Sequence, residues 1–104
     1  MVDVVKSATF DRWLRKLKDR RAAARVLVRI DRLVSGNPGD VKPAGNGVSE
    51  LRINYGPGYR VYYLRDGQQL ILLLSGGDKS SQDSDIKTAY RIAQEWHSKR
   101  GAQG

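Results

Sequence analysis

The fold is decided by residues 48–75, which read VSELRINYGPGYRVYYLRDGQQLILLLS. Polar and apolar side chains alternate over residues 50–55, which is the period of a strand with one buried face. Residues 59–65 are rich in aromatic and β-branched side chains and predict a second strand. The apolar run at residues 70–74 predicts a third strand that is covered on both faces. These segments are the expected centre of a β-sheet.

Turn residues separate these segments and set the direction of the chain. Gly56-Pro57-Gly58 reverses it after the first strand, and Asp66-Gly67 is the strongest hairpin signal in the sequence. Gly45-Asn46-Gly47 has similar turn chemistry, so a further short strand beginning at Val41 is one interpretation of the preceding segment. The middle of the chain is therefore expected to form an antiparallel meander.

Before this meander the sequence predicts one short strand and two helices. Residues 2–5 are β-branched and suit an edge strand, and Ser7 or Thr9 can cap the helix that follows. A break at Lys18 or Asp19 separates it from a second helix over residues 20–34, so that the pair forms a helical hairpin. Helical spacing gives the expected buried stripes as Phe10, Trp13, Leu14 and Leu17, then Ala23, Val26, Leu27, Ile30, Leu33 and Val34.

After the meander the sequence predicts one last helix. Ser80 or Ser81 can cap it, and residues 98–104 are expected to be a loose tail. The element order β-α-α-β-β-β-α predicts an α+β fold with a small antiparallel sheet, in a single domain over residues 1–104. The expected buried stripe of the last helix is Ile86, Ala89, Tyr90, Ala93 and either Trp96 or His97.

Composition excludes several classes of site. There is no cysteine, and therefore no disulfide, thiol nucleophile or thiolate metal site. The single histidine, His97, cannot hold a metal unaided, so we expect no metal and no cofactor. The longest apolar run is strand-sized, and the N-terminus is unlike a signal peptide. We therefore expect a cytoplasmic protein that does not bind membranes.

The charge is the first indication of function. A formal net charge of +8 on 104 residues favours a polyanion, above all nucleic acid or the ribosome, and also an acidic protein partner. Four arginines, Arg21, Arg25, Arg29 and Arg32, line one face of the second helix. This stripe has three interpretations: a solvated helix face, a contact with RNA phosphates, or a docking site for a partner protein.

Three motifs, in this order and at this spacing, resemble one family. They are GVSELR at 47–52, GPGYRVYY at 56–63, and LLLSGGDKSSQ at 72–82, followed by Asp85-Ile86 and Ala89. Residues 3–96 are thereby similar to the RelE/ParE/HigB superfamily of toxins from type II toxin–antitoxin systems. The similarity is greatest to the addiction-module killer proteins, akin to HigB and to phage Gp49-like proteins. The resemblance implies the RelE-like fold.

The same resemblance implies an mRNA endonuclease that cuts in the ribosomal A site, without a metal ion, and inhibits translation. In that chemistry the ribose 2′-OH attacks the adjacent phosphate and the 5′-oxygen leaves, so the site must stabilise negative charge and move protons. By position in the motifs, Arg60 is the implied phosphate-stabilising residue, Arg52 a second basic residue, and Lys79 the basic residue near the leaving group. Read without the resemblance, both arginines could instead be strand-surface residues paired with Glu50 or Asp66.

Some positions depart from the best-known RelE toxins. Val48 and Glu50 stand where those toxins carry lysines, and Asp85 is the nearest counterpart of a tyrosine. HigB-like members have a histidine near the C-terminus, for which His97 is a candidate. The general base is therefore open between Asp85, His97 and a lysine.

Two further residues, Tyr62 and Gln82, are candidate RNA contacts, since tyrosine can stack on an unpaired base. Because fold alone does not decide function, a ParE-like poison of DNA gyrase and a non-catalytic RNA-binding module are alternatives. The resemblance also implies partners, namely the ribosome, mRNA and a cognate antitoxin with a helix-turn-helix domain encoded by the adjacent gene.

Overall fold

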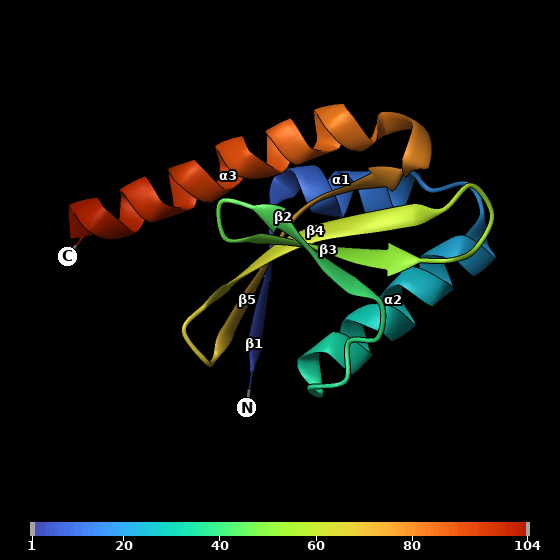
Figure 1. The fold of residues 1–104 in the computed structure, drawn as a ribbon, viewed down its shortest axis with the longest axis horizontal. Helices are drawn as coiled ribbons and strands as arrows, with labels where there is room; N and C mark the ends of the chain where they lie inside the picture. Colours follow the sequence, from blue (N-terminus) through green and yellow to red (C-terminus); the bar gives the residue numbers. More distant parts are fainter. Residues whose placement is uncertain (1, 104) are drawn as a thin grey trace.

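The protein folds as one sheet with helices on both faces (Figure 1). The computed structural model describes residues 2–103 and the side chains of residues 2–99. Its elements are β1 (Asp3–Lys6), α1 (Ala8–Lys16), α2 (Arg20–Val34), β2 (Val41–Gly45), β3 (Val48–Ile53), β4 (Tyr59–Asp66), β5 (Leu70–Asp78), the 3-10 turn η1 (Lys79–Ser81) and α3 (Gln82–Gln103).

The sheet confirms the predicted meander and adds one parallel pair. Strand order is β1-β5-β4-β3-β2, and the four strands from β2 to β5 are antiparallel. The expectation of a wholly antiparallel sheet is wrong, because β1 pairs with β5 in parallel. Ser7 joins the end of β1 to α1 and β5: its Oγ accepts from Phe10 N at the start of α1 and donates to Leu74 O at 2.6 Å. The start of α1 is thereby tied beside β5.

Each face of the sheet has its own apolar core. Phe10, the buried stripe of α2 and the side chains of Leu51, Val61 and Tyr63 form one cluster. The other cluster joins Tyr62, Leu64 and Leu72 to the small side chains of α3. Neighbours along β4 therefore point to opposite faces, as strand alternation requires. α1 and α2 cover one face, and α3 covers the other (Figure 1).

α2 begins and ends where the sequence predicts, but the helix is turned about its axis so that its buried side differs from the predicted stripe. Asp19 caps it by accepting from Arg21 N and Ala22 N. The buried side chains are Ala22, Val26, Ile30 and Leu33, whereas the predicted core residue Leu27 is 43% exposed. Arg25 and Arg29 provide the reason, because both bind groups on the sheet side of the helix, as described below.

α3 is anchored to the sheet along its length. Tyr90 OH donates to Ala44 O, and Trp96 Nε1 donates to Asp66 Oδ2 at 2.8 Å. The helix continues to Gln103, so the expectation of a loose tail from Ser98 is wrong as far as that residue, and Gly104 lies outside the described residues. No helix in the described part of the chain is both long and apolar enough to cross a membrane.

Candidate functional site

Three basic side chains meet at one end of the face that α3 covers. Arg52 on β3 lies directly opposite Arg60 on β4, and Gly77 on β5 is the next partner in the same row. Strand alternation directs this row away from the α1/α2 core, which takes Leu51 and Val61. Arg52, Arg60 and Lys79 line one cavity of about 300 Å³, together with Asp40, Ile53, Asn54 and Gly58. The structure therefore brings together the three basic residues that the motifs single out.

Lys79 is held at the rim of this cationic cavity by two neighbouring turns. Gly58 has φ +83, a left-handed conformation, and a Cβ placed there would lie 3.8 Å from Lys79 Cβ. On the other side, Asp78 caps the 3-10 turn that begins with Lys79, accepting from Ser80 N at 2.8 Å. Hydrogen bonds from Ser80 lower the pKa of Asp78, so it stays charged as a cap. The Lys79 side chain itself remains exposed.

Arg60 is buried and paired. Its Nη1 lies 3.1 Å from Glu50 Oε1, with the two side chains only 10% and 5% exposed. Glu50 Oε1 also accepts from Gln82 Nε2 at 3.5 Å, so the pair is tied to the first residue of α3. The Nε of Arg60 has no hydrogen-bond partner among the described residues. One end of the guanidinium is thus fixed, while the residue still lines the cavity.

Arg52 is held differently, by its backbone. Its carbonyl accepts from Arg29 Nη1 at 2.6 Å. Its side chain is 39% exposed and meets Asp40 only at 3.9 Å, between Nε and Oδ2, in an ion pair of which Asp40 is 60% exposed. Such exposed pairs contribute little to stability. The Arg52 guanidinium is therefore free to turn toward an anion in the cavity.

Asp85 lies beside the same row of the sheet. It accepts from Ser81 Oγ at 2.5 Å, and a Cβ at Gly77 would overlap its carboxylate. Burial, the largest cause, raises the pKa of Asp85, while the bond from Ser81 opposes the shift. Asp85 is therefore placed next to the partner of Arg60, although it does not line the cavity itself.

The predicted RNA contacts on the sheet have other environments. Tyr62 is fully buried, so no face of its ring is open to a base, and its proposed stacking role is wrong. Its hydroxyl has no hydrogen-bond partner among the described residues, and burial, with Glu50 next, raises the pKa of Tyr62. Gln82 is half-buried and directs its amide to Glu50. Gln82 thereby supports the Glu50–Arg60 pair, whereas Tyr62 is a buried core residue on the same face.

The arginine stripe of α2 is not one continuous charged surface. Arg29 binds backbone carbonyls, with Nη1 to Arg52 O at 2.6 Å and Nη2 to Pro38 O at 2.8 Å. The guanidinium of Arg25 lies over the ring of Tyr55, 4.5 Å from its centroid. These two arginines fasten α2 to the sheet, and Arg21 and Arg32 remain exposed.

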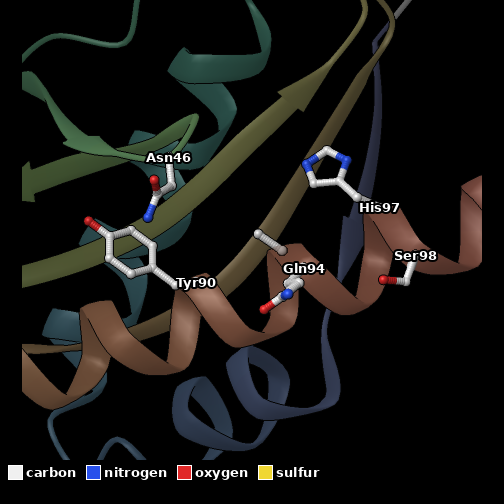
Figure 2. Close-up of a pocket in the computed structure, with 6 residues that line it drawn as sticks. Asn46, Tyr90, Gln94, His97 and Ser98 are labelled. Carbon is white, nitrogen blue, oxygen red and sulfur yellow. The ribbon is translucent and has the colours of Figure 1, made fainter.

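His97 lies elsewhere. It lines a separate cavity of about 460 Å³ with Asn46, Tyr90, Ala93, Gln94 and Ser98 (Figure 2). At the rise of an α-helix it is ~18 Å along α3 from Asp85. The structure therefore does not bring His97 to the cationic cavity. Among the described residues, no group of three or more His, Cys, Asp or Glu side chains could hold a metal ion.

Sequence reasoning did not single out the contact of Asp85 with Gly77. Gly76 and Gly77 are adjacent glycines near the end of β5. In the structure a Cβ at Gly76 would overlap the ring of Trp13 from α1, and one at Gly77 would overlap Asp85. Each glycine admits a side chain from an opposite face of the sheet. Glycine inside a strand is a signal for such close approach.

Comparison with known proteins agrees with the motifs. The family model described as phage derived protein Gp49-like matches residues 12–96. An uncharacterized protein of Haemophilus influenzae is 51% identical over 94 residues, which is 90% of this chain and 95% of that protein. The matched range includes the cationic cavity and all residues that line it.

Proposed function

The chain belongs to the family of phage-derived Gp49-like proteins, a toxin-like family related to RelE, and on that premise we propose that it is the toxin of a type II toxin–antitoxin pair. We propose further that it cleaves mRNA on the ribosome without a metal ion and so inhibits translation. The observation that carries the proposal is the convergence of Arg52, Arg60 and Lys79 on one cavity. A cavity lined by three cations suits a phosphate whose negative charge increases during reaction.

The proposed reaction breaks the RNA chain by internal transfer. The 2′-OH loses its proton and attacks the adjacent phosphorus, the bond to the 5′-oxygen breaks, and that oxygen gains a proton. The products are a 2′,3′-cyclic phosphate and a 5′-OH. Arg60, fixed at one end by Glu50, would hold the phosphate oxygens with the free part of its fork. Arg52 would turn from Asp40 to the same phosphate, and Lys79 would protonate the leaving oxygen.

Asp85 and His97 are the two candidates for the general base apart from a lysine, and Asp85 is the better supported of the two. Its carboxylate lies against Gly77, the cross-strand neighbour of Arg60, and burial raises its pKa toward the range of a useful base. His97 lines the other cavity, and eleven residues of α3 lie between it and Asp85. Asp85 is therefore the nearer candidate, and we propose it ahead of His97 as the base, although neither side chain lines the cavity that would hold the phosphate.

The proposal also names partners. A net charge of +8 supports binding to ribosomal RNA, and a toxin of this class needs a cognate antitoxin. The gyrase poison needs no cations arranged around a phosphate, whereas a non-catalytic RNA-binding module would use the same cations and differ in making no cut. This arrangement is the reason that the nuclease is preferred over the gyrase poison.

The test is induced expression in a bacterium, with growth recorded and 5′ ends of a reporter mRNA mapped by primer extension. Arg52→Ala and Lys79→Ala remove partly or fully exposed cations and leave the fold intact, and Arg65→Ala, an exposed arginine at the far end of β4, is the matched control. New 5′ ends within translated codons are expected for wild type and Arg65→Ala, and loss of them for the two cavity variants. Growth arrest without mRNA cuts would contradict the nuclease proposal and favour gyrase poisoning. Absence of both effects would favour the binding module.

A further inference from the structure

The outer side of α2 is an apolar surface with basic margins. Leu27 is 43% and Val28 56% exposed, and with the exposed Ala24 they follow helical spacing along one side. A depression of about 410 Å³, lined by Arg21, Ala24, Arg25 and Val28, runs along the same side. We call Ala24, Leu27 and Val28 the α2 outer face. Among the described residues the remaining exposed large apolar side chain is Val5, on β1.

The internal contacts of α2 explain neither exposed side chain. The buried stripe of Ala22, Val26, Ile30 and Leu33 already fills the groove against the sheet. Arg29 occupies the flank of α2 that packs toward Pro38, and Arg25, which lines one edge of the depression, places its guanidinium over the ring of Tyr55. Adjacent exposed apolar side chains on a helix are typical of a surface that binds another protein.

The charges around this face favour an acidic partner over RNA. The sequence of α2, RRAAARVLVRIDRLV, contains five arginines and one aspartate. Arg20, Arg21 and Arg32 are exposed beside the outer face, and the exposed Asp31, one turn after Leu27 and Val28, is the single acidic residue among them. RNA backbone would be bound best by a continuous row of arginines, and the inward contacts of Arg25 and Arg29 interrupt that row. An apolar centre between cations instead matches a helix with an apolar stripe and acidic flanks.

We propose that the α2 outer face docks an acidic amphipathic helix of a partner protein. The identification of that partner as the antitoxin rests on the proposed function. Its acidic, amphipathic character is inferred from the surface of α2 alone. α2 packs on the face of the sheet opposite to the one that Arg52 and Arg60 occupy, so the partner need not fill the cationic cavity. A complex formed in this way keeps its anion-binding cavity open.

The experiment measures binding of a fluorescently labelled acidic peptide to the full chain by anisotropy, and locates it by backbone NMR shifts. The peptide has about 18 residues, or ~5 helical turns, with leucines on one side and glutamates on its flanks. The variant Leu27→Ser/Val28→Ser is compared with Val5→Ser, which removes an exposed apolar side chain on β1. Binding at least ~10-fold weaker is expected for the double variant, with no change for Val5→Ser. NMR shifts are expected at the α2 outer face.

Several results would overturn the proposal. One is equal binding of the peptide to the double variant, and another is equal binding of a peptide with lysine in place of every glutamate. Displacement of the peptide by a short single-stranded RNA that shifts the same α2 amides would assign the surface to RNA. A concentration-dependent dimer of wild type that the double variant abolishes would assign it to a second copy of this chain. None of these readouts involves RNA cleavage, so failure here and failure of the proposed nuclease are separate results.

Discussion

Removing Arg60 should destabilise the protein far more than removing an exposed arginine. At 3.1 Å and an effective dielectric constant of ~20, its attraction to Glu50 is about 5 kcal/mol before desolvation is subtracted. Arg60→Ala leaves the Glu50 carboxylate buried without its counter-ion, which typically costs ~3–5 kcal/mol. A domain of this size has a total stability of roughly 5–15 kcal/mol, so the variant should be marginal. Loss of activity in Arg60→Ala alone could therefore come either from unfolding of the protein or from loss of the cation in the cavity.

A second substitution separates these causes. Glu50→Gln/Arg60→Ala removes both charges and keeps an oxygen that can accept from Gln82, so we expect it to cost only ~1–2 kcal/mol. Urea unfolding followed by the fluorescence of Trp13 and Trp96 measures both variants. Arg60→Ala should lower the midpoint by roughly 2 M, and the double variant should recover most of that loss. If Arg60→Ala unfolds within about 0.5 M of wild type, or the double variant is no more stable than Arg60→Ala, the account of the buried pair is refuted.

Three further variants test the surroundings of the site. Asp85→Asn should raise stability at neutral pH, because burial raises the pKa of Asp85 and thus penalises its charged form in the folded protein. This gain in stability should shrink as the pH falls, because Asp85 then becomes protonated in the wild type. A gain that stays constant from pH 7 to pH 4 in urea unfolding would contradict this reasoning. The same variant should lose mRNA cleavage if Asp85 is the base. Arg29→Ala breaks three hydrogen bonds to carbonyls and should cost ~2–3 kcal/mol by urea unfolding, while the exposed Arg21→Ala should stay within about 0.5 kcal/mol. Equal effects of the two substitutions would show that Arg29 has no structural role. Gly77→Ala should cost ~1–3 kcal/mol and alter the NMR resonances of Asp85, because its Cβ overlaps that carboxylate; an unshifted Asp85 would contradict the close packing.

The strands of the meander could be predicted because residues within and between the strands determine them locally. Alternation over residues 50–55 predicts which side chains are buried, and the turns at Gly56-Pro57-Gly58 and Asp66-Gly67 predict the strand order, and β3 to β5 follow both. The start of α2 could also be predicted from a local residue, because Asp19 caps the helix there. The parallel pairing of β1 was not predictable, because it depends on where α1 and α2 return the chain.

Packing partners from distant segments were the main source of error. Leu27 fits the apolar spacing of α2, but contacts of Arg25 and Arg29 with residues far along the chain rotate it outward. α3 runs through the tail expected from Ser98 as far as Gln103, seven residues past Trp96, whose side chain binds Asp66.

The candidate site was predictable to the extent that motifs and strand alternation determined it. Arg52 and Arg60 share a face by alternation, and Lys79 follows the next strand, so all three reach one cavity. The pairing of Arg60 with Glu50, which the sequence left as one of two options, required the register of β3 with β4. The contact of Asp85 with Gly77 required the angle at which α3 crosses β5, which no local pattern encodes.

The most direct test of the central claim uses purified ribosomes and an mRNA whose A-site codon carries either ribose or 2′-deoxyribose at the cleavage position. The account predicts a cut in the ribose mRNA only, with a 2′,3′-cyclic phosphate and a 5′-OH as ends, and loss of the cut with folded Arg52→Ala and Lys79→Ala but not with Arg65→Ala. Cleavage of the 2′-deoxy mRNA, cleavage by both cavity variants at the wild-type rate, or no cleavage by folded wild type would contradict it.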